Sequence, residues 1–180
     1  MAGCSTCTRT GNRSSGTVRW DLVFAWLEAS ALGHLMRESG PWTYAIVNLA
    51  HILGVALLFG AVVMLDLRLL GVWRRVPLAT IAQVAAPVAL CGFVVAAASG
   101  LGLLATKATE YIGNPFLSVK FPAIAIGLVN AIVLSVSPAW RARGTRELSL
   151  RELRLLAWMG GTSLVSWLTA ISAGRMIGYW

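Results

Sequence analysis

Long apolar segments alternate with short polar ones along most of the chain. The first apolar segment, residues 42–65, contains about 24 residues without a charge, enough for a helix to cross roughly 30 Å of hydrocarbon. Similar segments follow at about 78–105, 116–136 and 155–177. The pattern predicts an all-α fold in which four helices form a transmembrane bundle.

The chain before the first apolar segment divides into two parts. Residues 1–17 are rich in Ser, Thr, Gly and Arg, a composition typical of a disordered tail. Residues 20–38 have an apolar face but end in charged residues, which favours an N-terminal interfacial amphipathic helix lying at the membrane surface. Gly40-Pro41 should end that helix. We therefore expect a disordered tail and a membrane domain over 18–180.

Small residues recur at four-residue intervals in the second apolar segment, at Gly92, Ala96 and Gly100. This spacing places them on one helix face, where the absence of large side chains lets a second backbone approach closely. Packing within the bundle is the interpretation we favour. A face for association with another copy of the chain is the alternative.

The composition supports the membrane interpretation and narrows the range of partners. Hydrophobic residues make up 57% of the chain, charged residues 12%, and the net charge is +8. The basic residues flank the apolar segments rather than forming a stripe with aromatic residues, so a lipid bilayer is the expected partner and nucleic acid is not. Other membrane subunits or further copies of this chain are additional candidate partners.

The distribution of Lys and Arg predicts the orientation. Eight arginines near span ends lie on one side of the bundle, against four basic residues on the other, which predicts that the two basic loops of this multi-pass protein lie in the cytoplasm. The eight are Arg68, Arg74, Arg75, Arg141, Arg143, Arg146, Arg151 and Arg154.

The cysteines and short motifs give little support for enzyme chemistry. Cys4 and Cys7 form a single CxxC in the polar tail, with no second pair to complete a metal site, and Cys91 lies in an apolar segment as a small packing residue. No cleavable signal peptide is evident, since the first twenty residues lack an apolar stretch. Zinc-protease, P-loop and nucleophile-elbow motifs are absent, so whether the protein is an enzyme stays open.

A few polar residues within the apolar segments mark a candidate site. Tyr44, Asn48 and His51 share one helix face, and His51 lies about 13 Å inside its segment. Lys120 lies near the start of the third segment, and Ser99 lies near the end of the second. Both are on the same side of the membrane as His51. Thr169, Ser172 and Arg175 lie in the matching half of the fourth.

Each of these residues also has a structural interpretation. His51 could hydrogen-bond Asn48 or Ser99 simply to join helices. Lys120 is near enough to the interface to extend its ammonium group to the lipid headgroups, and Arg175 is more suited to that than to binding a ligand. Ionisable groups inside a membrane are costly to bury, however, and they commonly face a bundle interior and mark function.

Several blocks of the sequence resemble a family of small bacterial membrane proteins that carry a domain of unknown function. The blocks begin with Tyr44 to Gly54, and the most specific is the DLRLLG motif from Asp66 to Gly71. In that block we expect Asp66 and Arg68 to form a topological anchor at the membrane surface. Further blocks are Gly113-Asn114-Pro115-Phe116, Lys120 and Ala173-Gly174-Arg175. The resemblance implies a protein of the bacterial cytoplasmic (inner) membrane.

A more distant resemblance concerns the placement of one His and one Lys. A His on one helix and a Lys at the start of a later one is similar to CopD-like copper-resistance proteins and to the HemJ type of protoporphyrinogen oxidase. The resemblance implies that His51 is a haem ligand and that Lys120 supports activity. The chain lacks the aromatic and proline-rich stretch of the HemJ type, and its methionines are too scattered for a copper path.

Two hypotheses of different classes follow. In the first, His51 is the axial iron ligand of a b-type haem in a small redox or haem-handling protein, with Asn48, Tyr44 and Lys120 around the cofactor and Gly54 giving it room. Because His34 is the only other histidine, a site with one His or with His and another ligand is favoured over a bis-His site. In the second, the chain is a non-catalytic membrane subunit or scaffold. A small transporter or a copper-related protein is less favoured, a transporter because no inverted repeat is evident.

Overall fold

The computed structural model describes residues 20–180, so the expected tail and its Cys4/Cys7 pair lie outside the described residues. The described chain is helical, with short connections. Its helices are α1 (Trp20–Glu28), α2 (Ala31–Glu38), α3 (Gly40–Leu69), α4 (Leu78–Thr106), η1 (Ala108–Tyr111), α5 (Pro115–Val136), α6 (Pro138–Ala142), α7 (Leu150–Met176) and η2 (Ile177–Tyr179).

Four of these segments are long and apolar enough to cross a membrane: α3, α4, α5 and Leu150–Tyr179. At most 33% of the apolar window in each segment is buried within the protein. Large side chains such as Leu90 and Ile132 stay more than 60% exposed. A monomeric soluble protein rarely exposes so much contiguous apolar surface, whereas lipid covers it without cost. The predicted all-α fold with four membrane-crossing helices is confirmed.

Several helix ends differ from those read off the apolar pattern. The fourth segment begins at Leu150, five residues before the expected 155, because Ser149 and Glu152 form a capping box that starts the helix in its charged first turn. The interfacial stretch is two helices instead of one. The Ser30 hydroxyl accepts a hydrogen bond from the Gly33 amide and starts α2 there.

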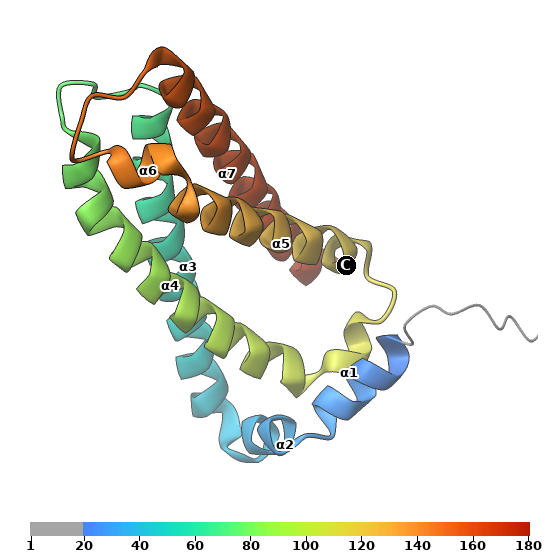
Figure 1. Ribbon diagram of the computed structural model, residues 1–180. Coiled ribbons are helices and arrows are strands. Elements are labelled where there is room, and N and C mark those ends of the chain that lie inside the picture. Colours follow the sequence, from blue (N-terminus) through green and yellow to red (C-terminus); the bar gives the residue numbers. More distant parts are fainter. Residues whose placement is uncertain (1–19) are drawn as a thin grey trace, which may run out of the picture.

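The long helices form two hairpins, α3 with α4 and α5 with α7, which are joined mainly where α3 meets α7 (Figure 1). We call the side that holds the loops 70–77 and 137–149 the basic side, because most of the arginines lie there. The other side, where α1, α2 and η1 lie, we call the opposite side. In Figure 1 the hairpins meet near the basic side and diverge toward the opposite side.

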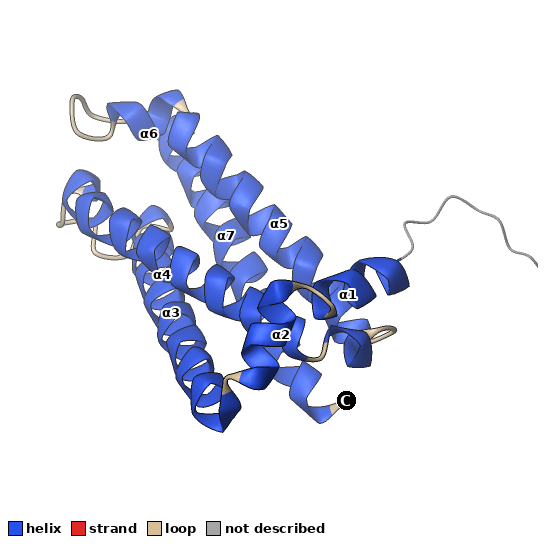
Figure 2. Ribbon diagram, turned by 90° about the horizontal axis from the view of Figure 1, so that it is seen from below, coloured by secondary structure: helices blue, strands red, loops and turns tan. Residues whose placement is uncertain are grey.

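The short helices α1 and α2 lie across the opposite side and are attached to the end of α4 (Figure 2). Gly33 allows the close approach, since a Cβ there would lie 3.0 Å from the carbonyl oxygen of the fully buried Ala105. Arg37 connects α2 to both α4 and α1, because its guanidinium donates to the Thr106 carbonyl of α4 at 3.4 Å and to the Glu28 carbonyl of α1 at 2.9 Å.

The contact between α3 and α4 is the most extensive in the fold, and it is made through small residues. A Cβ on Gly92 would collide with the backbone nitrogen of Leu58, and one on Gly54 would lie 2.7 Å from the Ala96 nitrogen. Backbone therefore meets backbone along this surface, which we call the α3–α4 seam. The stripe of small residues serves packing within the bundle, as expected.

Substituting Gly92 tests the α3–α4 seam. Gly92→Ala should lower the free energy of unfolding by about 1–3 kcal/mol, because the added methyl meets backbone that no rotamer change can move. Gly60→Ala on the same hairpin is the matched control, since a Cβ there meets nothing within 4 Å. Thermal unfolding of the purified variants in one detergent compares them. Equal midpoints for the two variants would show that the helices are not in backbone contact at Gly92.

Candidate functional site

His51 lies in the α3–α4 seam, where its ring contacts the backbone of α4. Its Nδ1 is 2.9 Å from the Ala96 carbonyl oxygen and 3.3 Å from the Ser99 hydroxyl. The ring can approach this closely because residue 100 is glycine, on which a Cβ would be 2.9 Å from His51 Cε1. The same small residues that bring the helices together thus make room for an imidazole.

These contacts determine which ring nitrogen carries the proton when His51 is neutral. A carbonyl oxygen only accepts, and the Ser99 hydroxyl already donates to the Val95 carbonyl at 2.5 Å. Nδ1 must therefore be the donor, and Nε2 keeps its lone pair. Within residues 20–180, Nε2 makes no hydrogen bond. An imidazole held in this way is the usual arrangement of a metal-ligating histidine.

Two residues expected beside His51 have other surroundings. Asn48 is exposed and its side chain makes no hydrogen bond among the described residues, so the Ala96 carbonyl orients the ring instead. Gly54 is buried against the Ala96 backbone, so α4 fills the space beside Gly54. The sequence pattern shows that these residues share a side of the helix with His51, but the helix is rotated so that Gly54 faces α4 and Asn48 does not.

Lys120 reaches across from α5 to α7. Its side chain runs along Gly174, where a Cβ would be 3.5 Å from the Lys120 nitrogen, and it is half-buried. No carboxylate of the described chain pairs with it. Its ammonium group is near enough to His51 for the two to interact electrostatically.

The other polar residues of the fourth segment do not join this group. Thr169 donates to the Val165 carbonyl of its own helix, and Ser172 is exposed. Arg175 donates to the Tyr179 hydroxyl at 2.7 Å and lies over that ring. The expected cluster on four helices is therefore smaller than predicted, with His51 and Ser99 in contact and Lys120 nearby.

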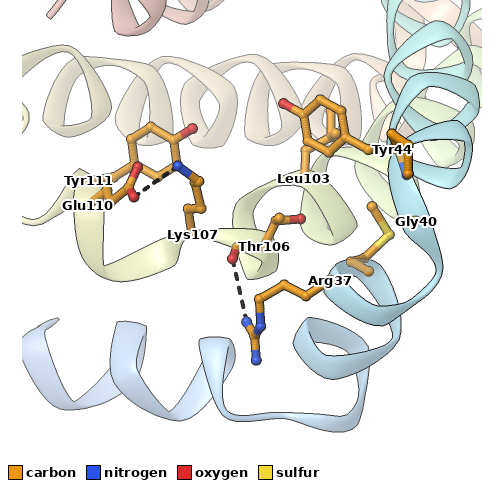
Figure 3. Close-up of a pocket in the computed structure, with 10 residues that line it drawn as sticks. Arg37, Gly40, Tyr44, Leu103, Thr106, Lys107, Glu110 and Tyr111 are labelled. Carbon is orange, nitrogen blue, oxygen red and sulfur yellow. Dashed lines mark hydrogen bonds and ion pairs between the residues drawn. The ribbon is translucent and has the colours of Figure 1, made fainter.

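Tyr44 lines a pocket of about 580 Å³ at the opposite side (Figure 3). Leu103, one turn along α4 from Gly100, lines the pocket as well, so the pocket continues the seam that holds His51 toward the membrane surface. Figure 3 shows the Tyr44 and Tyr111 rings facing the same space from α3 and η1. The other lining residues are Met36, Arg37, Gly40, Pro41, Thr106, Lys107 and Glu110.

The sequence pattern did not indicate this pocket, because its charged residues Arg37, Lys107 and Glu110 each lie just outside an apolar segment. The ion pair with Glu110, at 3.0 Å, raises the pKa of Lys107. Burial raises the pKa of the Tyr111 hydroxyl. The pocket thus combines two phenols, two cations and one carboxylate at the membrane surface.

Comparison with known proteins places the chain in a family. Residues 23–180 match a family of unknown function (DUF6644). The chain belongs to that family. No curated protein and no solved structure matches it.

The DLRLLG block has a clear structural basis in this DUF6644 chain. Leu69 belongs to a group of buried apolar residues on the basic side, which we call the core cluster and which also contains Leu78, Ala82, Leu134, Ala139, Trp140 and Leu156. Gly71 has a φ of 100°, which glycine adopts readily. Arg68 is the surface residue, donating to the Val76 carbonyl at 2.8 Å across the loop. Asp66 is not a surface anchor as we had expected, because it faces α7 and is only 2% exposed.

The protein ligands available to a metal ion are few. No group of three or more His, Cys, Asp or Glu side chains occurs within residues 20–180 of this DUF6644 protein. His34 lies on the exposed face of α2, 3.7 Å from Glu38, and does not contact His51. A metal ion at His51 would therefore meet fewer than three such side chains within residues 20–180.

Glu28 attaches α1 to the pocket wall. Its carboxylate accepts hydrogen bonds from the Thr109 amide at 2.8 Å and the Thr109 hydroxyl at 2.7 Å, and these lower the pKa of Glu28. A carboxyl group whose pKa is lowered by folding stabilises the folded state fully at any pH above its ordinary pKa, which is 4.5 for Glu28. That contribution is lost as the pH falls through the lowered pKa. The attachment of α1 to η1 should persist at neutral pH.

Replacing Glu28 tests this attachment. Glu28→Ala should increase amide hydrogen exchange over Ala108–Tyr111 at neutral pH several-fold, because the Thr109 amide loses its acceptor. Glu38→Ala is the control, since Glu38 is exposed and contacts His34 instead. Unchanged exchange in Glu28→Ala would mean that α1 does not rest on η1 in solution.

Proposed function

We propose that this polytopic DUF6644 protein binds one b-type haem through His51 Nε2, as a small redox or haem-handling protein of the bacterial cytoplasmic membrane. In this proposal the basic loops face the cytoplasm, as the arginine distribution favours. The single observation that carries the proposal is the hydrogen bond from His51 Nδ1 to the Ala96 carbonyl. It fixes the ring on a rigid helix and leaves the second nitrogen for a ligand.

The residues present would hold a haem through one protein ligand, His51. A haem ligand needs a neutral imidazole, oriented through its other nitrogen, in a largely apolar setting. His51 meets these needs because the surrounding α3–α4 seam is built from small residues such as Ala96 and Gly100, with the apolar side chain of Val95 beside them. Arg37 and Lys107, at the surface end of the same seam, are the residues that would hold carboxylates of the ligand.

When bound, a haem would supply one-electron chemistry. This chain would position and tune it. The Ala96 carbonyl would keep the imidazole in one tautomer, and Lys120 would contribute a positive charge near the site. Tyr44 lies toward the surface end of the site, where it would limit access of water.

A scaffold is the second candidate, and the same hydrogen bond favours it. The bond from His51 to Ala96 joins two helices, and such a bond contributes about 0.5–1.5 kcal/mol of stability by itself. In this alternative the histidine simply fixes α3 against α4, and the protein serves as a non-catalytic membrane subunit.

Absorption spectroscopy of the two histidine variants separates these candidates. Protein purified from a haem-sufficient host should carry a Soret band that is lost in His51→Ala and kept in His34→Ala, because only His51 has a free nitrogen inside the bundle. Circular dichroism should show equal helix content in all three proteins. A colourless wild type that stays colourless after haem is added would favour the scaffold.

Variants of Lys120 extend the same measurement. Lys120→Leu should reduce the haem retained by several-fold, and Lys120→Arg should restore part of it, because guanidinium keeps the charge but differs in shape and hydration. Full retention in Lys120→Leu would show that the Lys120 charge does not act on the site.

A further inference from the structure

Asp66 lies inside the protein, at the place where the two hairpins meet. It is 2% exposed, and Gly160 of α7 packs so closely that a Cβ there would be 3.1 Å from the Asp66 carbonyl oxygen. Leu69, one turn along α3, continues the contact with α7. The carboxyl group is therefore enclosed between α3 and α7, at the main junction of the hairpins.

No cation lies against this carboxyl group. Among residues 20–180, the ion pairs involve other acids, namely Glu38, Glu110 and Glu152. Arg68 directs its Nε to the Val76 carbonyl. Arg143, in the loop above, is held over the Trp140 ring at 4.1 Å. An ionised Asp66 would thus be buried without a compensating charge.

The polar surroundings of Asp66 are equally sparse. The Ser163 hydroxyl of α7 is the polar group that faces it, and Oδ2 has no hydrogen-bond partner among the described residues. The side-chain amide of Asn130 of α5 donates to the Met159 carbonyl at 3.0 Å instead of to Asp66. Leu78 and Ala82 of α4 are apolar members of the adjoining core cluster. No titratable side chain of α4, α5 or α7 faces the site.

We propose that Asp66 is a proton-binding site: its carboxyl group holds a proton at neutral pH and exchanges it with water on the basic side. The reaction is the loss of H⁺ from a neutral carboxylic acid to water, which leaves a carboxylate, and its reversal. Burying a carboxylate without a partner costs far more than burying the neutral acid, so proton uptake is the available means of compensation. A metal cation would need more oxygen ligands than Asp66 and Ser163 provide.

The position of Asp66 makes such exchange feasible. It lies three residues before the end of α3, about 4.5 Å from the basic side, beneath the core cluster that includes Leu156 and Trp140. Separation of α3 from α7 at this point would expose it to water. The site is about 22 Å along α3 from His51, so the proposal does not depend on haem binding.

Infrared spectroscopy tests the proposal on the full chain in lipid. The wild type at neutral pH should show the C=O stretching band of a protonated carboxylic acid, which shifts in D₂O and is absent in Asp66→Asn. Glu147→Gln is the matched control and should keep the band, because Glu147 is exposed in the basic loop. The absence of any protonated-acid band that depends on Asp66 would overturn the proposal.

A second variant covers the case in which Asp66→Asn does not fold. Ser163→Ala removes the hydroxyl that faces the carboxyl group, so the band should persist at a shifted frequency. A band unmoved by Ser163→Ala would show that it does not come from Asp66. A carboxylate band that changes when sodium is replaced by choline would also contradict the proposal and indicate a bound cation instead.

Discussion

The rest of the structure depends on backbone-to-backbone packing between α3 and α4. In lipid there is no hydrophobic driving force between helices, so close contact and hydrogen bonds must hold them together. Gly54 and Gly92 let the two backbones meet, and Gly100 leaves space for an imidazole in the same seam. The His51 hydrogen bond to Ala96, and the pocket above it, exist because the helices are this close.

Much of the fold could be predicted because length and apolarity alone define a membrane-crossing helix. Which face of each helix is buried could not be predicted, because lipid-facing and buried positions are both apolar and no periodic pattern separates them. For that reason the sequence pattern indicated the pairing of His51 with Ser99 but misplaced Asn48 and Gly54. Asp66 was misjudged for a related reason: its sequence neighbour Arg68 is a surface residue, but the turn of the helix directs the two side chains apart.

Helix α3 presents a titratable group to a different neighbour in each of its halves. His51 meets α4 in the half toward the opposite side, and Asp66 meets α7 near the basic side. The two groups are held by different contacts: a seam of small residues around His51, and the junction between hairpins around Asp66. A change in the packing of α3 against α7 would therefore alter the surroundings of the Asp66 carboxyl group and leave those of His51 intact.

The tautomer of His51 tests the account most directly, because the geometry of the seam determines it. Nitrogen NMR of haem-free, ¹⁵N-histidine-labelled His34→Ala protein in lipid observes this one imidazole. The hydrogen bond to Ala96 predicts that the proton of the neutral ring is on Nδ1 and that Nε2 is bare. A proton on Nε2, with Nδ1 bare, would contradict the contact between His51 and α4 and the ligand position inferred from it.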